Sequence, residues 1–389
     1  MLFQIIITTV LVILSLNALY LFVFSAAGFS AKEKLSLPNE FLDNKRILVL
    51  IPGYKEDTVI ISSVQSVMAQ HYNKAKFKCV VLADSFQTST IENIKQTGAE
   101  VFELPEDENR NKAKSIQKFL ACCHESFDAC IVLDADNCID ASMLQKANNY
   151  LKSGSRIIQA RRVAKNENNS MSRLDALSEI INNHIFRKGQ RALGLSASLI
   201  GSGMIIDMNV FRMVMQDMNV FSGFDKEMEL RILKNKLTIE YAEDILVYDE
   251  KVSNHNNFVN QRRRWSYAQM FFLKKYFLSA FAQLIRFGNC DYFNKVIQFA
   301  LMPRVISLGL SLCLILLTAF SGITFLIASI IVFVLIVSAL VMPLLPELKK
   351  AEIFSLSKAL PSAFLGMWIA IVTSKRASKK FIHTPHNIN

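Results

Sequence analysis

The sequence of 389 residues lacks the features of several large protein classes. Its seven cysteines are odd in number and form no CxxC pair, so neither a disulfide framework nor a zinc site is indicated. Glycine and proline number only 13 and 8, while hydrophobic residues make up 51%, which excludes a collagen-like or a disordered chain. The net charge of +11 belongs to no recognisable nucleic-acid-binding module, and we expect no nucleic-acid partner.

Charged residues are absent from the first 31 positions, where Leu2–Ala27 forms one long apolar run. The run has no basic start and is longer than the apolar core of a signal peptide, so we predict a retained transmembrane helix. Lys32, Lys34, Lys45 and Arg46 follow it. Because basic residues collect on the inner side of membrane proteins, we expect the N-terminus outside and the middle of the chain in the cytoplasm.

Apolar runs return near the C-terminus. Met302–Phe320 and Ile323–Leu344 predict a transmembrane hairpin, and the one charged residue in them is Arg304, near an end, which disfavours a transporter. Ala359–Thr373 is short for a crossing, so we expect it to lie in the membrane interface and the basic tail to return to the cytoplasm. Ser266–Phe287 predicts an amphipathic helix at the membrane surface, with a core helix as the alternative.

The hydrophilic middle of the chain alternates between short β-rich runs and helical stretches. The predicted strands are Ile47–Ile51, Cys79–Ala83, Glu100–Leu104, Cys130–Leu133 and Arg156–Ala160. The predicted helices are Val59–Gln70, Ile91–Thr97, Ala113–Cys123 and Ser142–Lys152. This alternation implies an α/β domain with a mostly parallel sheet, whose ligands bind beyond the carboxyl ends of the strands.

Carboxylates follow three of these strands, at Glu56, at Asp84, and at Asp134 and Asp136. Like charges raise each other's pKa, so acids gathered at one sheet edge indicate a bound cation. Mg²⁺ and Mn²⁺ prefer oxygen ligands and bridge to phosphates, and we predict one of them as the cofactor. Asp134 and Asp136 alternate along a strand end, which predicts opposite directions for their side chains. We expect Asp136 to bind the metal directly, with Asp134 as the second candidate ligand.

Four motifs follow one another along the chain: Ile51–Glu56 (IPGYKE), Leu133–Asp136 (LDAD), Phe224–Leu230 (FDKEMEL) and Gln261–Trp265 (QRRRW). In these motifs the chain resembles the membrane-embedded family 2 glycosyltransferases, which include cellulose, chitin and hyaluronan synthases. They stand where that family has its nucleotide-receiving turn and its DxD, TED and QxxRW motifs. The resemblance implies a GT-A-like domain that uses a nucleotide sugar, with uridine as the expected base.

The resemblance also assigns roles to individual residues. Those expected at the nucleotide are Pro52, Tyr54, Glu56, Asp84, Lys112 and Asp134. Those expected at the acceptor or the diphosphate are Gly203, Gln261, Arg264 and Trp265. Two alternatives stay open, a packed loop aromatic for Tyr54 and a solvated helix-start charge for Lys112. The loop at Arg110 and the tail segment Phe381–His386 also resemble loops of the family.

An inverting transferase needs a general base near the acceptor hydroxyl, and a carboxylate fits that role. Aligning Glu229 and Leu230 with the acid–leucine pair that commonly follows the TED motif puts Glu227 on its Asp. Lys226 then replaces the preceding Glu, which departs from the family pattern. Glu227 is therefore the expected base, and Asp225 is the alternative.

Together these features predict an inverting, metal-dependent hexosyltransferase that extends a polysaccharide at the inner face of the cell membrane. Single-sugar transfer to a lipid-linked acceptor, or a non-catalytic membrane scaffold of the same fold, are the alternatives. The expected partners are a nucleotide-sugar donor, a glycan or lipid-linked glycan acceptor, membrane lipid, and a second copy or an export partner. The expected units are a transmembrane helix (1–30), a transferase domain (31–265), interfacial helices (266–300), a transmembrane hairpin (301–345), and an interfacial helix with a basic tail (346–389).

Overall fold

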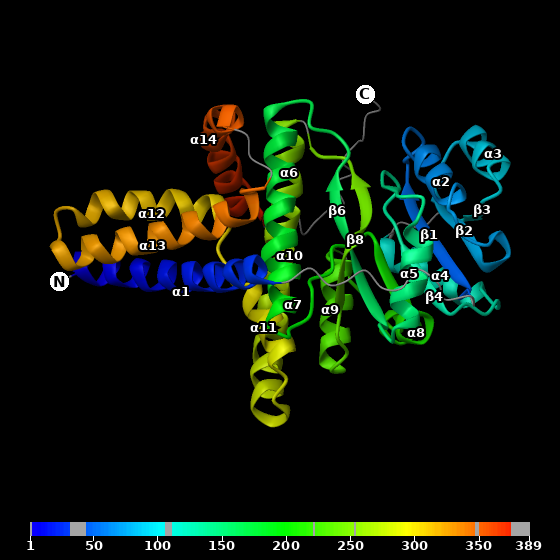
Figure 1. The fold of residues 1–389 in the computed structure, drawn as a ribbon, viewed down its shortest axis with the longest axis horizontal. Coiled ribbons are helices and arrows are strands. Elements are labelled where there is room, and N and C mark those ends of the chain that lie inside the picture. Colours follow the sequence, from blue (N-terminus) through cyan, green and yellow to red (C-terminus); the bar gives the residue numbers. More distant parts are fainter. Residues whose placement is uncertain are drawn as a thin grey trace.

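The computed structural model describes residues 2–31, 44–105, 111–220, 222–252, 254–346 and 350–374 (Figure 1). Its strands are β1 (Ile47–Tyr54), β2 (Phe77–Asp84), β3 (Glu100–Glu103), β4 (Ala129–Val132), β5 (Cys138–Ile139), β6 (Ile157–Ala164), β7 (Met204–Asp207) and β8 (Glu240–Asp249). Its helices up to residue 200 are α1 (Leu2–Ser30), α2 (Ile60–Met68), η1 (Lys74–Lys76), α3 (Thr88–Gln96), α4 (Lys112–Cys122), α5 (Met143–Lys152), α6 (Ser170–Asn183), the π-helix η2 (His184–Gly189) and α7 (Gln190–Ala192). The later helices are α8 (Met208–Met215), α9 (Phe224–Lys234), α10 (His255–Phe287), α11 (Cys290–Gln298), α12 (Arg304–Thr318), α13 (Ile323–Val341), η3 (Met342–Leu344) and α14 (Lys350–Val372). Arg110 and the tail segment Phe381–His386 lie outside the described residues.

The strands form one sheet in the order β3-β2-β1-β4-β7-β6-β8-β5. β1 pairs in parallel with β2 and β4, β2 with β3, and β6 with β8, while β7 is antiparallel to β4 and β6. The predicted fold class, an α/β domain with a mostly parallel sheet, is confirmed. The sequence prediction misses β5, β7 and β8. β8 escapes detection because a bulge interrupts its pairing with β6 between Ala160 and Arg161, which breaks the regular alternation.

Two hydrophobic cores cover the two faces of the sheet. Along β1, Leu48 and Leu50 face one core, and Ile47, Val49 and Ile51 face the other. The first core is closed by α4, α8, α9, α10 and α11, and the second by α2, α3 and α5. This double burial explains why the parallel strands read as continuous apolar runs in the sequence.

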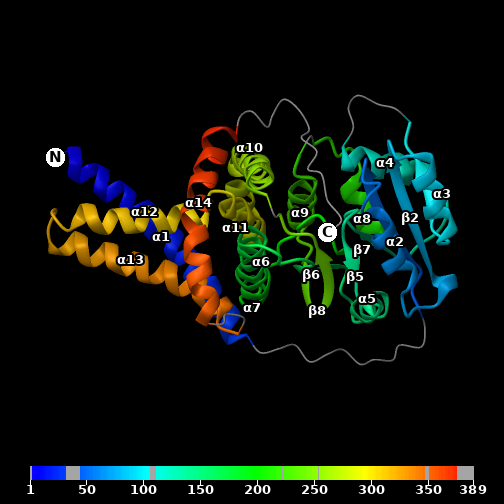
Figure 2. The same ribbon diagram turned by 90° about the horizontal axis from the view of Figure 1, so that it is seen from above.

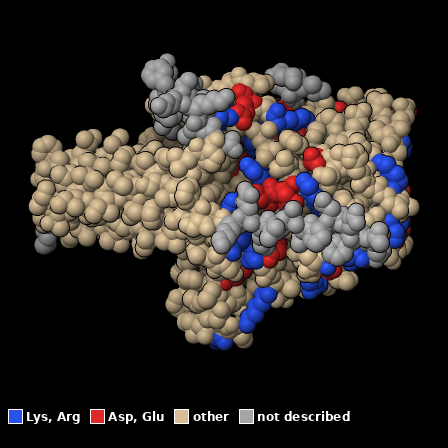
Figure 3. All heavy atoms as spheres, viewed as in Figure 1, with Lys and Arg blue, Asp and Glu red and all other residues tan. Residues whose placement is uncertain are grey.

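The apolar helices α1, α12 and α13 project from the sheet domain as one bundle, with α1 and α12 packed against α13 (Figures 1 and 2). Figure 3 shows that the visible face of this projection carries no charged side chains, whereas the sheet domain does. Among the described residues, Leu2–Ser30 and Ile323–Leu344 are long and apolar enough to cross a membrane. α12 is shorter than the predicted span because it begins after Pro303 and ends at Thr318.

The predicted boundary between residues 265 and 266 falls inside a continuous helix. α10 runs from His255 to Phe287 and carries both the QRRRW motif and the predicted amphipathic segment. It packs against α9, α11 and α14, so part of that segment belongs to the core. α14 begins nine residues earlier than the predicted interfacial helix and continues through Pro361. The motif helix and the C-terminal helix are therefore directly packed on each other.

Two glycines, one on each helix, allow the backbones of α1 and η2 to lie in direct contact. A Cβ atom added to Gly189 would lie 2.0 Å from the carbonyl oxygen of Phe24, and one added to Gly28 would lie 3.0 Å from His184. The His184 Nε2 atom also lies 2.8 Å from the carbonyl oxygen of Ser25. The first helix is thus fixed to the end of α6 by contacts that permit no side chain between them.

Candidate active site

A cavity of about 2530 Å³ begins at the carboxyl ends of β1, β4 and β8 and runs along α6 and α10 to the apolar helices. Most of the predicted site residues line it. They are Pro52, Tyr54, Glu56, Asp84, Lys112, Asp134, Asp136, Asp225, Gln261, Arg264 and Trp265. Gly203 and Glu227 are not on its wall. The sheet topology and the start of α10 thus gather residues from four separate motifs around one space.

The ends of β1 and β2 form the first wall of the cavity. Tyr54 and Asp84 are paired across the two parallel strands, and the backbone N–H of Lys55 donates to the carbonyl oxygen of Asp84 at 3.1 Å. Gly53 is required here because an added Cβ would lie 2.7 Å from the ring of Phe86. The predicted nucleotide residues of the first motif and Asp84 therefore lie side by side.

Lys112 binds the first aspartate of the LDAD motif. As the first residue of α4, it is held by Asn111, whose side chain caps the helix by accepting from the N–H of Lys114 at 2.9 Å. The Lys112 Nζ atom lies 2.5 Å from Asp134 Oδ1 and donates to the carbonyl oxygen of Gly201 at 2.7 Å. Lys112 is thus not a solvated helix-start charge, which removes that alternative.

Asp134 and Asp136 lie in the loop after β4, which ends at Val132, so the strand alternation proposed for them does not apply. Asn137 donates from Nδ2 to Asp136 Oδ1 and to Asp249 Oδ1, both at 3.1 Å. Asp249 ends β8 at the same sheet edge, and the sequence analysis missed it. The available signal was an acid directly after the apolar run Ile245–Tyr248.

The donor set at this edge suits a divalent cation in part. Asp136 is buried at 7% exposure and Asp134 is half-buried, and both offer hard carboxylate oxygens on the cavity wall. Among the residues that the structure describes, no group of three or more His, Cys, Asp or Glu side chains is arranged to hold a metal. Mg²⁺ commonly uses one or two carboxylates and completes its shell with water and substrate phosphates, so two carboxylates suffice for such a site.

The two candidate bases point in different directions from α9. Asp225 lines the cavity, where its Cβ lies 3.7 Å from the position of a Cβ added to Gly201. Glu227 is only 3% exposed, and both of its carboxylate oxygens accept from the hydroxyl of Tyr276 at 2.7 Å. The Nε atom of Arg231 also donates to Glu227 at 3.2 Å. Residues two apart in a helix face nearly opposite sides, so Asp225 faces the cavity and Glu227 does not. Which of the two is the base stays a prediction.

Gly203 is a packing glycine, contrary to its predicted place beneath the acceptor. Its φ is +65°, and an added Cβ would lie 2.8 Å from Val247 Cγ2 and 3.2 Å from Ala160 Cβ. The contact is therefore with β6 and β8 and not with the cavity. Gly201, two residues earlier, lines the cavity instead.

The QRRRW motif occupies the first turns of α10. Gln261, Arg264 and Trp265 line the cavity, and burial lowers the pKa of Arg264. Arg262 is directed to α6, where its Nη2 atom lies 2.6 Å from Asp175 Oδ1. Its guanidinium also lies 4.4 Å from the ring centre of Trp265, so a cation–π contact fixes the position of this ring.

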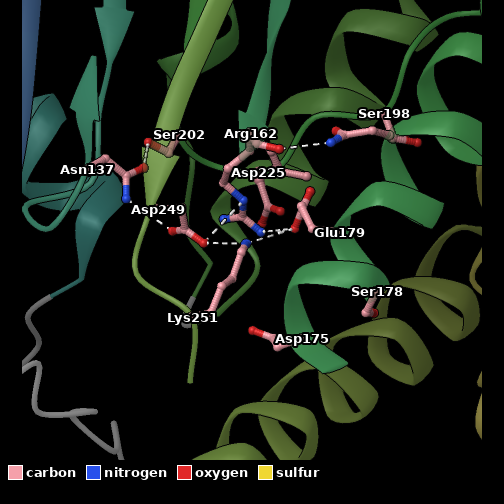
Figure 4. Close-up of polar contacts among 12 residues, drawn as sticks. Asn137, Arg162, Asp175, Ser178, Glu179, Ser198, Ser202, Asp225, Asp249 and Lys251 are labelled. Atoms are coloured by element: carbon pink, nitrogen blue, oxygen red, sulfur yellow. Dashed lines mark hydrogen bonds and ion pairs between the residues drawn. The ribbon is translucent and has the colours of Figure 1, made fainter. Parts of the chain in front are cut away.

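A buried ionic network forms the wall between the sheet edge and α6, and Figure 4 shows its members converging. Glu179 accepts from Arg162 at 2.8 Å and from Arg187 at 3.0 Å, and it lies 3.6 Å from Lys251. Asp249 lies 2.7 Å from Lys251 Nζ and 3.6 Å from Arg162 Nε. Burial opposes ionisation of Glu179, but the surrounding cations outweigh it and hold its pKa well below the usual range. No motif of the sequence indicates this network, because its members lie on separate elements, with Arg162 on β6, Glu179 on α6 and Asp249 at the end of β8.

A second buried ion pair involves Glu229, which lies on the same helix as Asp225. Glu229 lies 2.8 Å from Lys295 on α11, and burial raises the pKa of Glu229 to about 7 against the opposing effect of Lys295. Lys295 also donates to Gln298 at 2.7 Å and to Ser198 at 3.1 Å. This pair ties α9 to α11 and supports the helix that carries Asp225.

Ligands of such sheets bind beyond the carboxyl ends of the strands, and here that edge opens on a cavity lined by acids and a lysine. Residues 45–268 match the family described as "Glycosyltransferase like family 2". This match covers more than half of the chain, and the protein belongs to this family of glycosyltransferases.

The chain is similar to solved structures, and the first of the two that follow has the same fold. The mannosyltransferase PcManGT from Pyrobaculum calidifontis, in complex with GDP-Man and Mn²⁺, has a TM-score of 0.56 at 12% identity, over 97% of this chain and 100% of that chain. The S. aureus protein TarS (residues 1–349, in complex with UDP-GlcNAc) has a TM-score of 0.42 at 14% identity, over 86% of this chain and 90% of that chain. No curated protein matches the chain in a sequence search.

Proposed function

We propose that this glycosyltransferase transfers a sugar, with inversion, from a nucleotide-sugar donor to a lipid-linked glycan at the cytoplasmic surface of the cell membrane. The observation that supports this is the continuity of the cavity. At one end it is lined by Tyr54 and Asp84, and at the other by Leu21, Leu340 and Leu344 of the apolar helices. One space therefore connects the expected donor end with a surface suited to a hydrocarbon chain.

Extension of a polysaccharide is the second candidate, and the size of the cavity favours it. Its volume of about 2530 Å³ exceeds the roughly 300–1,000 Å³ of common small-molecule sites. The space is thus large enough for a donor together with several acceptor sugars. The lipid-linked acceptor comes first because the cavity ends at apolar side chains.

The donor is proposed to bind with its base at Asp84 and its diphosphate near Lys112 and Asp134. Lys112 is already positioned by Asn111, and its ammonium group supplies a positive charge at the point where a diphosphate would lie. Asp134 and Asp136 are the residues that would hold Mg²⁺ or Mn²⁺. When bound, such an ion neutralises charge on a diphosphate leaving group.

Asp225 is the proposed general base. Its carboxylate accepts the proton of the acceptor hydroxyl while that oxygen forms a bond to the anomeric carbon of the donor sugar. The bond between the anomeric carbon and the diphosphate oxygen breaks, and the nucleoside diphosphate leaves with the bonding electrons. Attack from the face opposite the leaving group inverts the anomeric centre. The Lys226 Nζ atom lies 3.6 Å from the Oδ2 atom of this carboxylate.

Paired substitutions on α9 test this proposal. Asp225→Asn should reduce transfer about 10²- to 10⁴-fold, the range for loss of a general base, with donor binding little changed. Glu227→Gln should retain transfer, because its side chain lies outside the cavity and bonds to Tyr276. Sugar transfer is measured with purified full-length protein by screening UDP- and GDP-linked sugars and sizing the product. Retained transfer in Asp225→Asn, or no transfer by the wild type with any donor, would contradict the proposal.

The membrane arrangement completes the proposal. Leu2–Ser30 and the α12–α13 hairpin are proposed to be inserted, with the sheet domain and the C-terminus in the cytoplasm and α14 in the membrane interface. The apolar surface of α1, α12 and α13 and the candidate spans support this. The five predicted units stay a proposal, with the boundary at 265 moved to the start of α10. Self-association or an export partner also stays a prediction.

A further inference from the structure

Arg304 is the basic residue where the ionic network meets the apolar helices. It opens α12 directly after Pro303 and lines the cavity. Its Nη2 atom donates to Ser178 on α6, at 2.8 Å to the hydroxyl and 3.2 Å to the carbonyl oxygen. Its Nη1 atom is buried and has no hydrogen-bond partner, and Arg304 makes no ion pair with the described residues. A buried guanidinium donor without an acceptor is costly, and this donor lies beside an open space.

The charges around Arg304 do not balance. The ion pairs on this wall and Arg304 itself contribute five cations, namely Arg162, Arg187, Lys251, Arg262 and Arg304. The acids that face them are Asp175, Glu179 and Asp249. Each of the other four cations is paired with one of these acids, whereas Arg304 is paired with none of them. An unpaired buried cation favours the binding of an anion.

The space beyond Arg304 is apolar. Apolar side chains near Arg304 in the sequence line the cavity, namely Met302 and Leu308. Three more come from α13 and η3, namely Leu340, Val341 and Leu344. An anion bound at Arg304 would thus have a hydrocarbon surface on one side and α6, with Ser178 and the ionic network, on the other. A free sugar chain has no group that uses both surfaces, whereas a lipid phosphate does.

We propose that Arg304, held by Ser178, binds the phosphate group of a lipid-linked acceptor, whose hydrocarbon chain lies against the apolar helices. This inference rests on the proposed function, because it names the acceptor chemistry for the same cavity. Phosphate is the anion that fits, since the unpartnered Nη1 atom carries N–H donors and a guanidinium makes strong charge-assisted hydrogen bonds to phosphate. The phosphate would be an anchor that presents the acceptor hydroxyl to Asp225.

The test uses decyl phosphate as the probe, with inorganic phosphate and decanol as the two partial probes. Binding is measured by titration calorimetry on the purified full chain in one nonionic detergent. Wild type should bind decyl phosphate more tightly than either partial probe. Arg304→Gln should weaken this binding about 10- to 100-fold, the range for a hydrogen bond to a charged group. Arg286→Gln, an exposed arginine near the end of α10, is the matched control and should not change binding.

Several outcomes would overturn the proposal. Equal binding of decyl phosphate by Arg304→Gln and wild type would remove Arg304 from the site, and tight binding of inorganic phosphate would indicate a free-phosphate site. Should Arg304→Gln fail to fold, Ser178→Ala removes only the supporting hydroxyl and should weaken decyl phosphate binding several-fold. Nucleotide release from the donor is measured on the wild type as a separate test of the proposed function. If wild type releases no nucleotide yet binds decyl phosphate through Arg304, the proposed function fails and this inference stands.

Discussion

Glu179 is the residue whose loss should unbalance the ionic network most. The side chain is 6% exposed and lies within 3.6 Å of Arg162, Arg187 and Lys251. Glu179→Gln keeps the size of the side chain but leaves these three cations with one fewer buried acid. Removing one partner of a buried ion pair costs about 3–5 kcal/mol, because the other charge stays buried and uncompensated. For a domain of this size, about 2–4 °C per kcal/mol converts this loss into a lower melting temperature by about 6–20 °C.

The sign of the pH effect follows from the same network. The pKa of Glu179 is lower in the folded than in the unfolded chain, so the unfolded chain binds more protons below the ordinary value of 4.5. The stabilisation by Glu179 is therefore present at neutral pH and is lost as the pH falls below that value. Glu179→Gln should lack this acid-dependent loss.

The assay is thermal unfolding of the detergent-solubilised protein at a fixed scan rate, because large membrane-associated proteins commonly unfold irreversibly. Glu167→Gln is the control, since Glu167 is 40% exposed and its ion pair with Arg173 lies at the surface. That variant should melt within about 2 °C of wild type, as expected for an exposed pair. A melting temperature of Glu179→Gln equal to that of the control would refute the view that the network is a strongly coupled buried unit.

Two further predictions concern the metal and the membrane. Asp136→Asn should preserve the fold, as judged by thermal unfolding, but lose nearly all transfer. Chelation with EDTA should abolish transfer by the wild type in the same way. Full activity after EDTA treatment would exclude the metal role. A cysteine introduced at Asn387 should not react with a membrane-impermeant thiol reagent added to intact cells, and strong labelling from outside would overturn the proposed topology.

The sheet was largely predictable because its strands are buried on both faces. Ile47–Ile51 and Cys79–Ala83 read as short apolar runs bounded by polar turns, and β1 and β2 lie there. β7 was not predictable in the same way, because its four residues Met204–Asp207 follow a glycine turn and pair antiparallel to both neighbours. Local sequence specifies that a segment is apolar, but the direction of pairing depends on the rest of the sheet.

The site residues were predictable where a motif lies at the end of a strand. They were not predictable where the direction of a side chain decides whether the residue faces the cavity. Asp84 and Asp134 follow strands, and both line the cavity. Asp225 and Glu227 are two residues apart and therefore lie on opposite faces of α9. An alignment of the motif by sequence alone does not show which of the two acids faces the cavity. Glu179 and Asp249 carried no motif, and both are paired with Arg162 of β6, an element separate from their own. Such ion pairs exist only after the fold has brought the segments together.

The glycine contacts between α1 and η2 have a consequence for protein engineering. A shortened protein that begins at residue 44, made to avoid detergent, would lose the helix that Gly189 accommodates. It would uncover the apolar surface formed by Leu177, Ile181 and Ile185, which packs against Leu21 and Phe24. Such a variant should aggregate or require added surfactant even though every predicted donor-site residue is retained. A replacement for α1, such as a designed amphipathic helix with glycine at position 28, is therefore the sounder route to a water-soluble enzyme.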